Sequence, residues 1–239
     1  MSRFFRPELT LAMAGGQALL QEKAPFKKVR RQEKTLPAVA FEERLRDALT
    51  LLPLTAPARL HLFLPSSQFL FWNVPWVSAQ LSEIECVELA SNLLRQDFDL
   101  SAQDLAFTLS PAAFGQSRLA CGLSRSKLDA LRPLLPVGIT LAGVRPLLSL
   151  SWAHLQATRE PLLYTEPGFA ALLARAEDGL RMHCRRLPQD RFADDDTAHS
   201  LAELLGIQAP RKFRLHLNAA QAEAPGFDAL DLTLLMRAT

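Results

Sequence analysis

The sequence predicts a mixed α/β fold in which short strands alternate with helices. Between Arg59 and Val144, apolar strand-like runs and helical repeats follow one another with few breaks. After Pro161, three strand-like runs are separated by glycine-containing turns. The chain has 239 residues, of which 49% are hydrophobic, so it can bury a sizeable core as one large domain or two small ones.

The first predicted element is a hairpin near the start of the chain. Apolar residues 9–14 and 17–20 flank Gly15 and Gly16, and glycine supplies the positive φ that a tight turn needs. Residues 41–52 follow as an amphipathic helix with Leu45 and Leu49 on its apolar face.

A basic segment lies between these two elements and carries Lys27, Lys28, Arg30 and Arg31. One interpretation is an exposed edge strand protected by its charges. The other is a docking site for an acidic partner segment or for acidic lipid headgroups. Nucleic acid is the weaker form of the second interpretation, because Phe26 alone is available for stacking on bases. The net charge of +2 also predicts no general affinity for nucleic acid.

Residues 59–144 are predicted to form a single module with the order β-β-α-β-β-α-β. Runs 59–64 and 69–74 are expected to pair as a hairpin across Pro65. Ser82 and Glu85 have the spacing of a capping box, which predicts a helix over 82–97. Strands are predicted at 105–109, 118–123 and 139–144, with a helix after Ser124.

The aromatic residues Phe71, Trp72 and Trp76 in this module are candidates for a partner-binding anchor. Successive strand residues point to opposite faces, so Phe71 and Trp72 are not both outside. The alternative is that these rings fill the core of the module.

The last third of the chain begins with a predicted helix over 147–156. Strands at 162–165, 169–175 and 180–187 are expected to form a meander. Asp194, Asp195 and Asp196 precede a helix that ends near Gly206, where they favour the helix dipole more than a metal site. A further strand is predicted at 211–217, and 230–236 is a last strand or short helix.

The middle of the sequence resembles the PilM and GspL group of actin-like proteins, which serve type IV pilus and type II secretion assembly platforms. The resemblance lies in HLFLPSSQFLFWNVPW, in the Ser-x-x-Glu opening of the next helix, and in the strand pair and helix that follow. It implies an actin-like, ribonuclease-H-like fold. The first lobe would be 1–158 with the inserted module 59–144, and the second lobe, 159–239, would be shortened.

The resemblance also implies two glycine-bearing turns that hold ATP and magnesium. Here Gly15-Gly16 has neither a preceding Asp nor a following Ser or Thr, and the second turn offers Glu166 and Gly168 around Pro167, which has no N–H. We therefore expect no catalytic residues, no resident cofactor and no metal site. The alternative is an ATP-binding protein with a divergent site built on Gly15, Gly16, Glu166 and Gly168.

The function implied is that of a non-catalytic adaptor, a degenerate member of the ATPase fold. Its partners would be an inner-membrane pilus or secretion platform protein, or its cytoplasmic tail, and a secretion ATPase; a homodimer is also expected. Three cysteines without Cys-x-x-Cys spacing are typical of reduced cytosolic thiols, and no apolar run spans a bilayer. The expected location is the cytoplasm, peripheral to the inner membrane.

Overall fold

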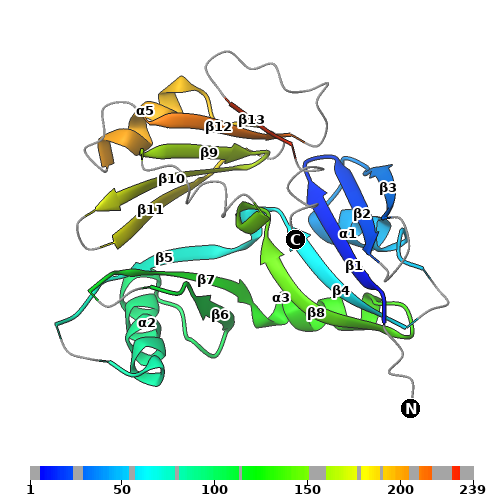
Figure 1. The fold of residues 1–239 in the computed structure, drawn as a ribbon, viewed down its shortest axis with the longest axis horizontal. Coiled ribbons are helices and arrows are strands. Elements are labelled where there is room, and N and C mark those ends of the chain that lie inside the picture. The colour runs from blue at the N-terminus through cyan, green and yellow to red at the C-terminus, as the bar shows by residue number, and fades with distance from the viewer. Residues whose placement is uncertain are drawn as a thin grey trace.

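The computed structural model describes most of the chain, and its strands form three sheets (Figure 1). The described residues are 6–23, 29–53, 57–78, 81–112, 115–150, 160–176, 179–188, 191–204, 210–216 and 228–231. Among them, no helix is long and apolar enough to cross a membrane.

The first sheet has five strands in the order β3-β2-β1-β4-β8. Its strands are β1 (Glu8–Ala14), β2 (Gln17–Lys23), β3 (Arg30–Thr35), β4 (Ala58–Leu64) and β8 (Ile139–Pro146). The first three strands pair antiparallel, whereas β4 lies parallel to both β1 and β8. Helix α1 (Phe41–Leu49) connects β3 to β4 and buries Leu45, Ala48 and Leu49, as its periodicity predicts.

The second sheet repeats this order with a different part of the chain, as β11-β10-β9-β12-β13. Its strands are β9 (Leu162–Glu166), β10 (Phe169–Ala176), β11 (Gly179–Arg186), β12 (Arg211–His216) and β13 (Asp228–Asp231). The directions repeat too, and α5 (Asp195–Leu204) occupies the position of α1. The predicted meander is confirmed. All five strands of the repeat are present, so the sheet of the second lobe is not shortened relative to the first.

The third sheet is inserted between β4 and β8 and has the order β5-β7-β6. It consists of β5 (Leu70–Val74), β6 (Leu105–Leu109) and β7 (Arg118–Ser124), with α2 (Glu83–Phe98) packed on one face. A short 3₁₀ helix (Ser66–Gln68) leads into this sheet, and α3 (Arg125–Leu131) with a second 3₁₀ helix (Arg132–Leu134) returns the chain to β8.

The hairpin expected from runs 59–64 and 69–74 is wrong. Strand β4 pairs with β1 and β8, while β5 pairs with β7 in a different sheet. Leu60, Leu62 and Leu64 are fully buried on one face of β4 and Phe63 is buried on the other, which suits a central parallel strand. The element order of 59–144 is as predicted, but its first and last strands belong to the first sheet.

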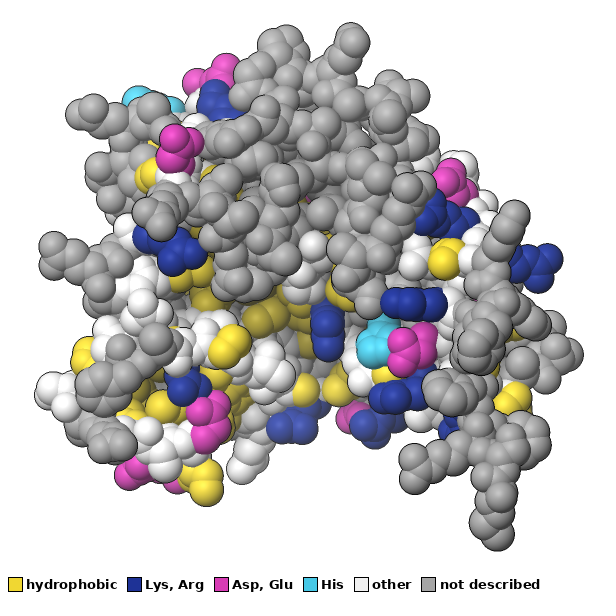
Figure 2. Space-filling view, in the orientation of Figure 1, with side chains coloured by type: hydrophobic (Ala, Val, Ile, Leu, Met, Phe, Trp, Pro, Cys, Tyr) yellow, Lys and Arg dark blue, Asp and Glu magenta, His cyan; other side chains and the backbone are white. Residues whose placement is uncertain are grey.

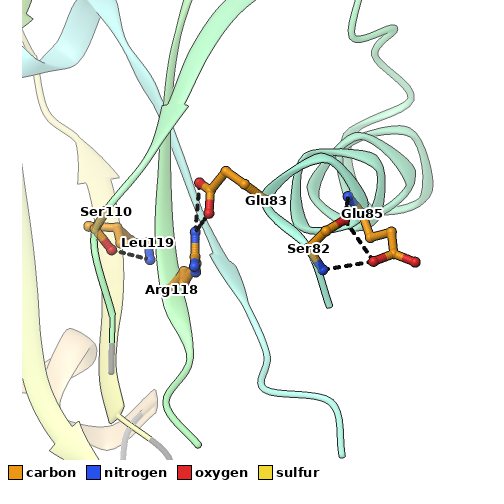
Figure 3. Close-up of polar contacts among 6 residues, drawn as sticks. All are labelled: Ser82, Glu83, Glu85, Ser110, Arg118 and Leu119. Atoms are coloured by element: carbon orange, nitrogen blue, oxygen red, sulfur yellow. Dashed lines mark hydrogen bonds and ion pairs between the residues drawn. The ribbon is translucent and has the colours of Figure 1, made fainter. Parts of the chain in front are cut away.

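The capping box predicted for the helix after Ser82 is confirmed (Figure 3). The Glu85 N–H donates to Ser82 Oγ at 3.3 Å, and the Ser82 N–H donates to Glu85 Oε2 at 2.7 Å. Hydrogen bonds from Ser82 lower the pKa of Glu85. At the same end of α2, Arg118 Nη1 on β7 donates to both carboxylate oxygens of Glu83 at 2.8 Å, which joins the helix to its sheet.

The inserted sheet also contacts the second sheet, through β5 and β11. The Asn73 amide donates to the Met182 carbonyl at 2.9 Å, and the Met182 N–H donates to Asn73 Oδ1 at 3.0 Å. A Cβ at Gly179 would lie 2.8 Å from the Ser117 nitrogen, so only glycine permits this approach. In Figure 1, β5 and β7 accordingly lie next to β11.

Two predicted elements are described only in part. Residues 148–150 are helical, and the remainder of the helix predicted over 147–156 lies outside the described residues, as does the boundary proposed at 158/159. Of the last predicted element, 230–236, the described part is the end of β13.

Candidate functional site

The two hairpin turns at corresponding places in the repeated sheets lie against each other. Gly15 is in the β1–β2 turn with φ +54°, and Gly168 is in the β9–β10 turn with φ +81°. A Cβ added to Gly15 would lie 3.1 Å from Pro167 Cγ. The turns are therefore in van der Waals contact, and Gly15 is required both by its backbone conformation and by this approach.

The Gly168 N–H and the Gly15 carbonyl in these turns already have partners. The Gly168 N–H donates to the Arg191 carbonyl at 2.8 Å, and Pro167 has no N–H. On the other side, the Gly15 carbonyl accepts a hydrogen bond from Arg44 Nη1 at 3.1 Å. A phosphate cradle depends on main-chain N–H groups directed at the anion, and these turns do not supply one at Pro167 or Gly168.

Glu166 ends β9 directly before the second turn and is completely buried. Its carboxylate accepts hydrogen bonds from the Ser66 N–H, from Ser66 Oγ at 3.0 Å and from the Tyr164 hydroxyl at 2.6 Å. The Leu148 N–H donates to Ser66 Oγ at 3.0 Å, which fixes this serine from the other side. Burial raises the pKa of Glu166 to about 7, although the hydrogen bonds from Tyr164 and Ser66 favour the charged form.

These residues do not fit magnesium and a nucleotide in the way the resemblance implies. Glu166, the carboxylate that the sequence offers beside the second turn, is directed at Ser66 and Tyr164 and connects β9 to the segment after β4. A magnesium ion needs oxygen ligands open to it and to the phosphates. The described residues here form a structural contact between the two repeated units.

A polar pocket of about 280 Å³ opens beside the two turns. Three basic side chains line it, Arg44 from α1, Lys127 from α3 and Arg186 at the end of β11. Lys127 Nζ donates to Gln68 Oε1 at 2.8 Å and lies 6.0 Å from the centre of the Phe41 ring. The pocket thus gathers positive charge from both repeated units.

The sequence placed only part of this site. Gly15 and Gly168 line the pocket, whereas Gly16 and the completely buried Glu166 are not among the lining residues. The basic residues were missed. Arg44 had a readable signal, because it stands within the apolar face of α1 and is only 6% exposed. Lys127 and Arg186 had none, since they are brought together by tertiary folding.

The predicted basic partner site is described in part. Lys27 and Lys28 lie outside the described residues. Arg30 and Arg31 are on β3, which is the edge strand of the first sheet. The described part of the segment thus forms an edge strand, and a role of these residues in partner binding stays a prediction. On the face shown in Figure 2, Lys and Arg side chains lie scattered among acidic and hydrophobic ones, not in one block.

The aromatic candidates separate into core and surface. Trp72 is only 4% exposed, donates from Nε1 to the Ala90 carbonyl at 3.1 Å, and packs edge-on against Phe107. An anchor role for Trp72 is therefore wrong, because its ring fills the space between the third sheet and α2. Phe71, on the opposite face of β5, is half-buried with its ring centre 5.6 Å from that of Phe169.

Trp76 lines a second pocket, of about 230 Å³, next to the start of α2. Val74, Cys86 and Leu89 contribute to its wall, and Arg118 stands at its side. Ile84 and Val87, on the first two turns of α2, are 73% and 40% exposed. Both lie on a different side of α2 from Cys86 and Leu89, so the apolar surface at this end of the inserted unit is the one around Trp76.

The described residues contain no group of three or more His, Cys, Asp or Glu side chains that could hold a metal ion. Asp194, directly before α5, has a structural role, since the Thr197 N–H donates to Asp194 Oδ1 at 2.9 Å. These hydrogen bonds with Thr197 lower the pKa of Asp194.

The repeated five-stranded sheets, joined at facing hairpin turns, define an actin-like fold. No family model and no curated protein sequence matches the chain. Solved structures do match it. A Bacteroides thetaiotaomicron protein of unknown function with an actin-like ATPase fold has a TM-score of 0.59 at 10% identity, covering 98% of this chain and 95% of its own.

Two further matches carry functional descriptions. The cytoplasmic domain of EpsL, an inner-membrane component of the type II secretion system of Vibrio cholerae, has a TM-score of 0.55 at 13% identity, covering 97% of this chain and 93% of that one. The PilM-PilN type IV pilus biogenesis complex matches with a TM-score of 0.53 at 13% identity, over 84% of this chain and 66% of that one. The resemblance to the PilM and GspL group is confirmed at the level of the fold.

Proposed function

We propose that the protein is a non-catalytic adaptor that links an inner-membrane pilus or type II secretion platform to cytoplasmic partners by protein–protein contacts. Its partners are a platform protein, or the cytoplasmic tail of one, and a secretion ATPase. The adaptor lies in the cytoplasm and is held at the inner membrane by its partner. It works without bound nucleotide.

One observation carries the non-catalytic part of this proposal. Glu166 and the turn after it are committed to structural contacts with Ser66, Tyr164 and Arg191, where an ATPase of this fold needs groups open to metal and phosphate. The likeness to the EpsL cytoplasmic domain over nearly the whole chain supports the assignment to a secretion or pilus platform.

The apolar surface around Trp76 is the proposed contact for a platform tail. A pocket of about 230 Å³ suits one or two apolar side chains of a short segment. An aromatic ring at the centre of such a surface contributes large contact area at low entropy cost. Arg30 and Arg31 on the edge strand β3 offer a second contact, suited to an acidic segment.

Titration calorimetry with the cytoplasmic tails of platform proteins encoded in the same genome tests the proposal. We expect one tail to bind, and Trp76→Ala to weaken its binding at least about tenfold, as loss of a central contact does. Val137→Glu is the matched control, because Val137 is 96% exposed and lies outside this surface. Binding by none of the tails contradicts the adaptor role, and equal weakening by Val137→Glu contradicts the assigned surface.

A homodimer is a further part of the proposal. Sedimentation equilibrium at several protein concentrations measures it directly, and a single monomeric mass throughout contradicts it.

A further inference from the structure

Helix α2 carries an exposed apolar stripe on the side away from its own sheet. Ile84 is 73% exposed and Phe98 is 39% exposed. Ile84, Ser91 and Phe98 follow one another at intervals of seven residues, close to two helical turns, so they lie in one line along the helix. Ala90 and Leu94, by contrast, are completely buried where α2 packs on the inserted sheet. In Figure 1, α2 lies on the side of this sheet that faces away from β10 and β11, so its outer stripe is accessible.

Two opposite charges lie on one flank of this stripe. Glu88 and Arg95 are both exposed and are also seven residues apart, so they form a second line beside the first. Seven residues correspond to about 10.5 Å along the helix, which is too far for the two side chains to pair with each other. Within the described part of the chain, neither Glu88 nor Arg95 forms an ion pair. Both charges are therefore available to a partner.

A second, antiparallel copy of α2 is complementary to both lines. When a two-fold axis passes beside Ser91, residues at equal distances before and after Ser91 face each other across the contact. Ile84 of one copy then meets Phe98 of the other, because each is seven residues from Ser91. Glu88 of one copy lies about 1.5 Å along the axis from Arg95 of the other, on the same flank. The symmetry repeats each contact, so the pair contains two apolar contacts and two ion pairs.

Ser91 suits the centre of such a contact. Its side chain is small, so two helices can approach closely at this point. Ser91 Oγ donates to the Val87 carbonyl of the same helix at 2.7 Å. The hydroxyl therefore keeps a hydrogen bond when a second helix excludes water from it. Val87, which is 40% exposed, widens the apolar stripe one turn before Ser91.

We propose that a second copy of this chain docks on α2, and that the two helices pair antiparallel about Ser91. This assignment rests on the homodimer of the proposed function and names the surface that forms it. Both copies use the same patch, so the assembly closes at two chains. The patch is separate from the Trp76 pocket, whose wall includes Cys86 and Leu89. Each chain of the dimer can therefore still bind a platform tail.

Sedimentation equilibrium of the full chain, from about 1 µM to about 200 µM, tests the surface. A single helix pair is a small interface, so we expect a weak dimer with a dissociation constant in the micromolar range. Ile84→Glu places a carboxylate against the Phe98 ring and is expected to raise the dissociation constant at least about tenfold. Leu204→Glu is the matched control, because Leu204 is also an exposed apolar residue, 65% exposed at the end of α5.

Exchanging the charges tests the antiparallel register itself. Glu88→Arg places a guanidinium opposite Arg95, and Arg95→Glu places a carboxylate opposite Glu88. Each variant alone is therefore expected to dimerise at least about tenfold more weakly. In an equimolar mixture of the two variants both facing pairs have opposite charges again, so we expect a heterodimer with nearly the affinity of the unsubstituted homodimer. Circular dichroism confirms that each variant is folded.

The possible results separate this assignment from the function on which it rests. A single monomeric mass at every concentration overturns both the homodimer and its surface, while the tail-binding test of the adaptor role is unaffected. A dimer that Ile84→Glu does not weaken, or that Leu204→Glu weakens equally, retains the homodimer and overturns the α2 surface. If the two charge variants associate no more tightly when mixed than alone, the antiparallel pairing about Ser91 is wrong.

Discussion

Glu166 connects the two repeated units through a carboxyl group that has no contact with solvent. Its partners, Ser66 and Tyr164, lie on the segment after β4 and on β9. Glu166 could be singled out from the sequence because it stands next to a Pro-Gly turn. Its structural role could not be predicted, because its partner Ser66 is 100 residues away in the sequence. Arg44 could have been predicted as a buried basic residue, because it is a charged residue within the apolar face of a predicted helix. Lys127 and Arg186 could not, because no local pattern places them together.

The raised pKa of Glu166 makes stability depend on pH. Its ordinary value is 4.5 and burial raises it to about 7, so the folded chain retains this proton where the unfolded chain has lost it. The raised pKa of Glu166 therefore stabilises the folded state fully below about pH 4.5. This stabilisation is lost as the pH rises to about 7, a change of roughly 3 kcal/mol in the free energy of unfolding. Glu166→Gln should flatten this dependence, which urea titrations from about pH 5 to about pH 8 measure. Equal pH slopes in both proteins contradict the prediction.

Gly15→Ala tests the contact between the two turns. The residue has φ +54°, which costs alanine about 1 kcal/mol, and the new methyl group would meet Pro167 Cγ at 3.1 Å. We expect a loss of about 2 kcal/mol in the free energy of unfolding. Gly115→Ala is the control for strain alone, because Gly115 has φ +82° and its added Cβ would have no atom within 4 Å. Equal losses in both variants mean that the turns do not constrain each other.

At the scale of elements, local sequence signals predicted helix starts and turns, but they did not predict which strands pair. The helix after Ser82 and the turns of the β9–β11 meander follow from capping and glycine patterns within a few residues. The expected pairing of β4 with β5 was wrong, because an apolar run by itself does not indicate which strands pair with it. Burial of Leu60, Leu62, Phe63 and Leu64 is typical of a central parallel strand, and the nearly continuous apolar run was the available clue.

Ser82→Ala tests the start of α2. The substitution removes the acceptor of the Glu85 N–H and one side of the capping box (Figure 3). The expected cost is about 1 kcal/mol in the free energy of unfolding, measured by chemical denaturation. Ser91→Ala is the matched control, because Ser91 Oγ donates to the Val87 carbonyl inside the same helix and has no capping role. A cost as large in the control contradicts the assignment.

At the scale of the whole molecule, the inserted sheet is not an independent appendage. Phe71 packs against Phe169 of the second sheet, and Asn73 forms two hydrogen bonds to the main chain of Met182. The amide of Asn73 takes the place that a neighbouring strand would have along β11, which is the edge of its sheet. The inserted unit is therefore attached to the second unit through β5.

Asn73→Ala should weaken this coupling. It leaves the Met182 N–H and carbonyl without their side-chain partners, at an expected cost of about 2 kcal/mol. Hydrogen exchange measures the effect locally. We expect the Met182 amide to exchange faster in the variant than in the unsubstituted protein, while amides in the central strand β4 keep their exchange rates. Unchanged protection at Met182 contradicts a structural role for Asn73.

The central claim is that this actin-like fold serves as an adaptor without magnesium–nucleotide binding. Thermal unfolding with ATP, in magnesium and in EDTA, tests it most directly, because a ligand at 100 times its dissociation constant stabilises a protein by about 2.7 kcal/mol. We predict that ATP produces no increase in melting temperature in either condition. An increase in melting temperature that requires both ATP and magnesium would contradict the claim.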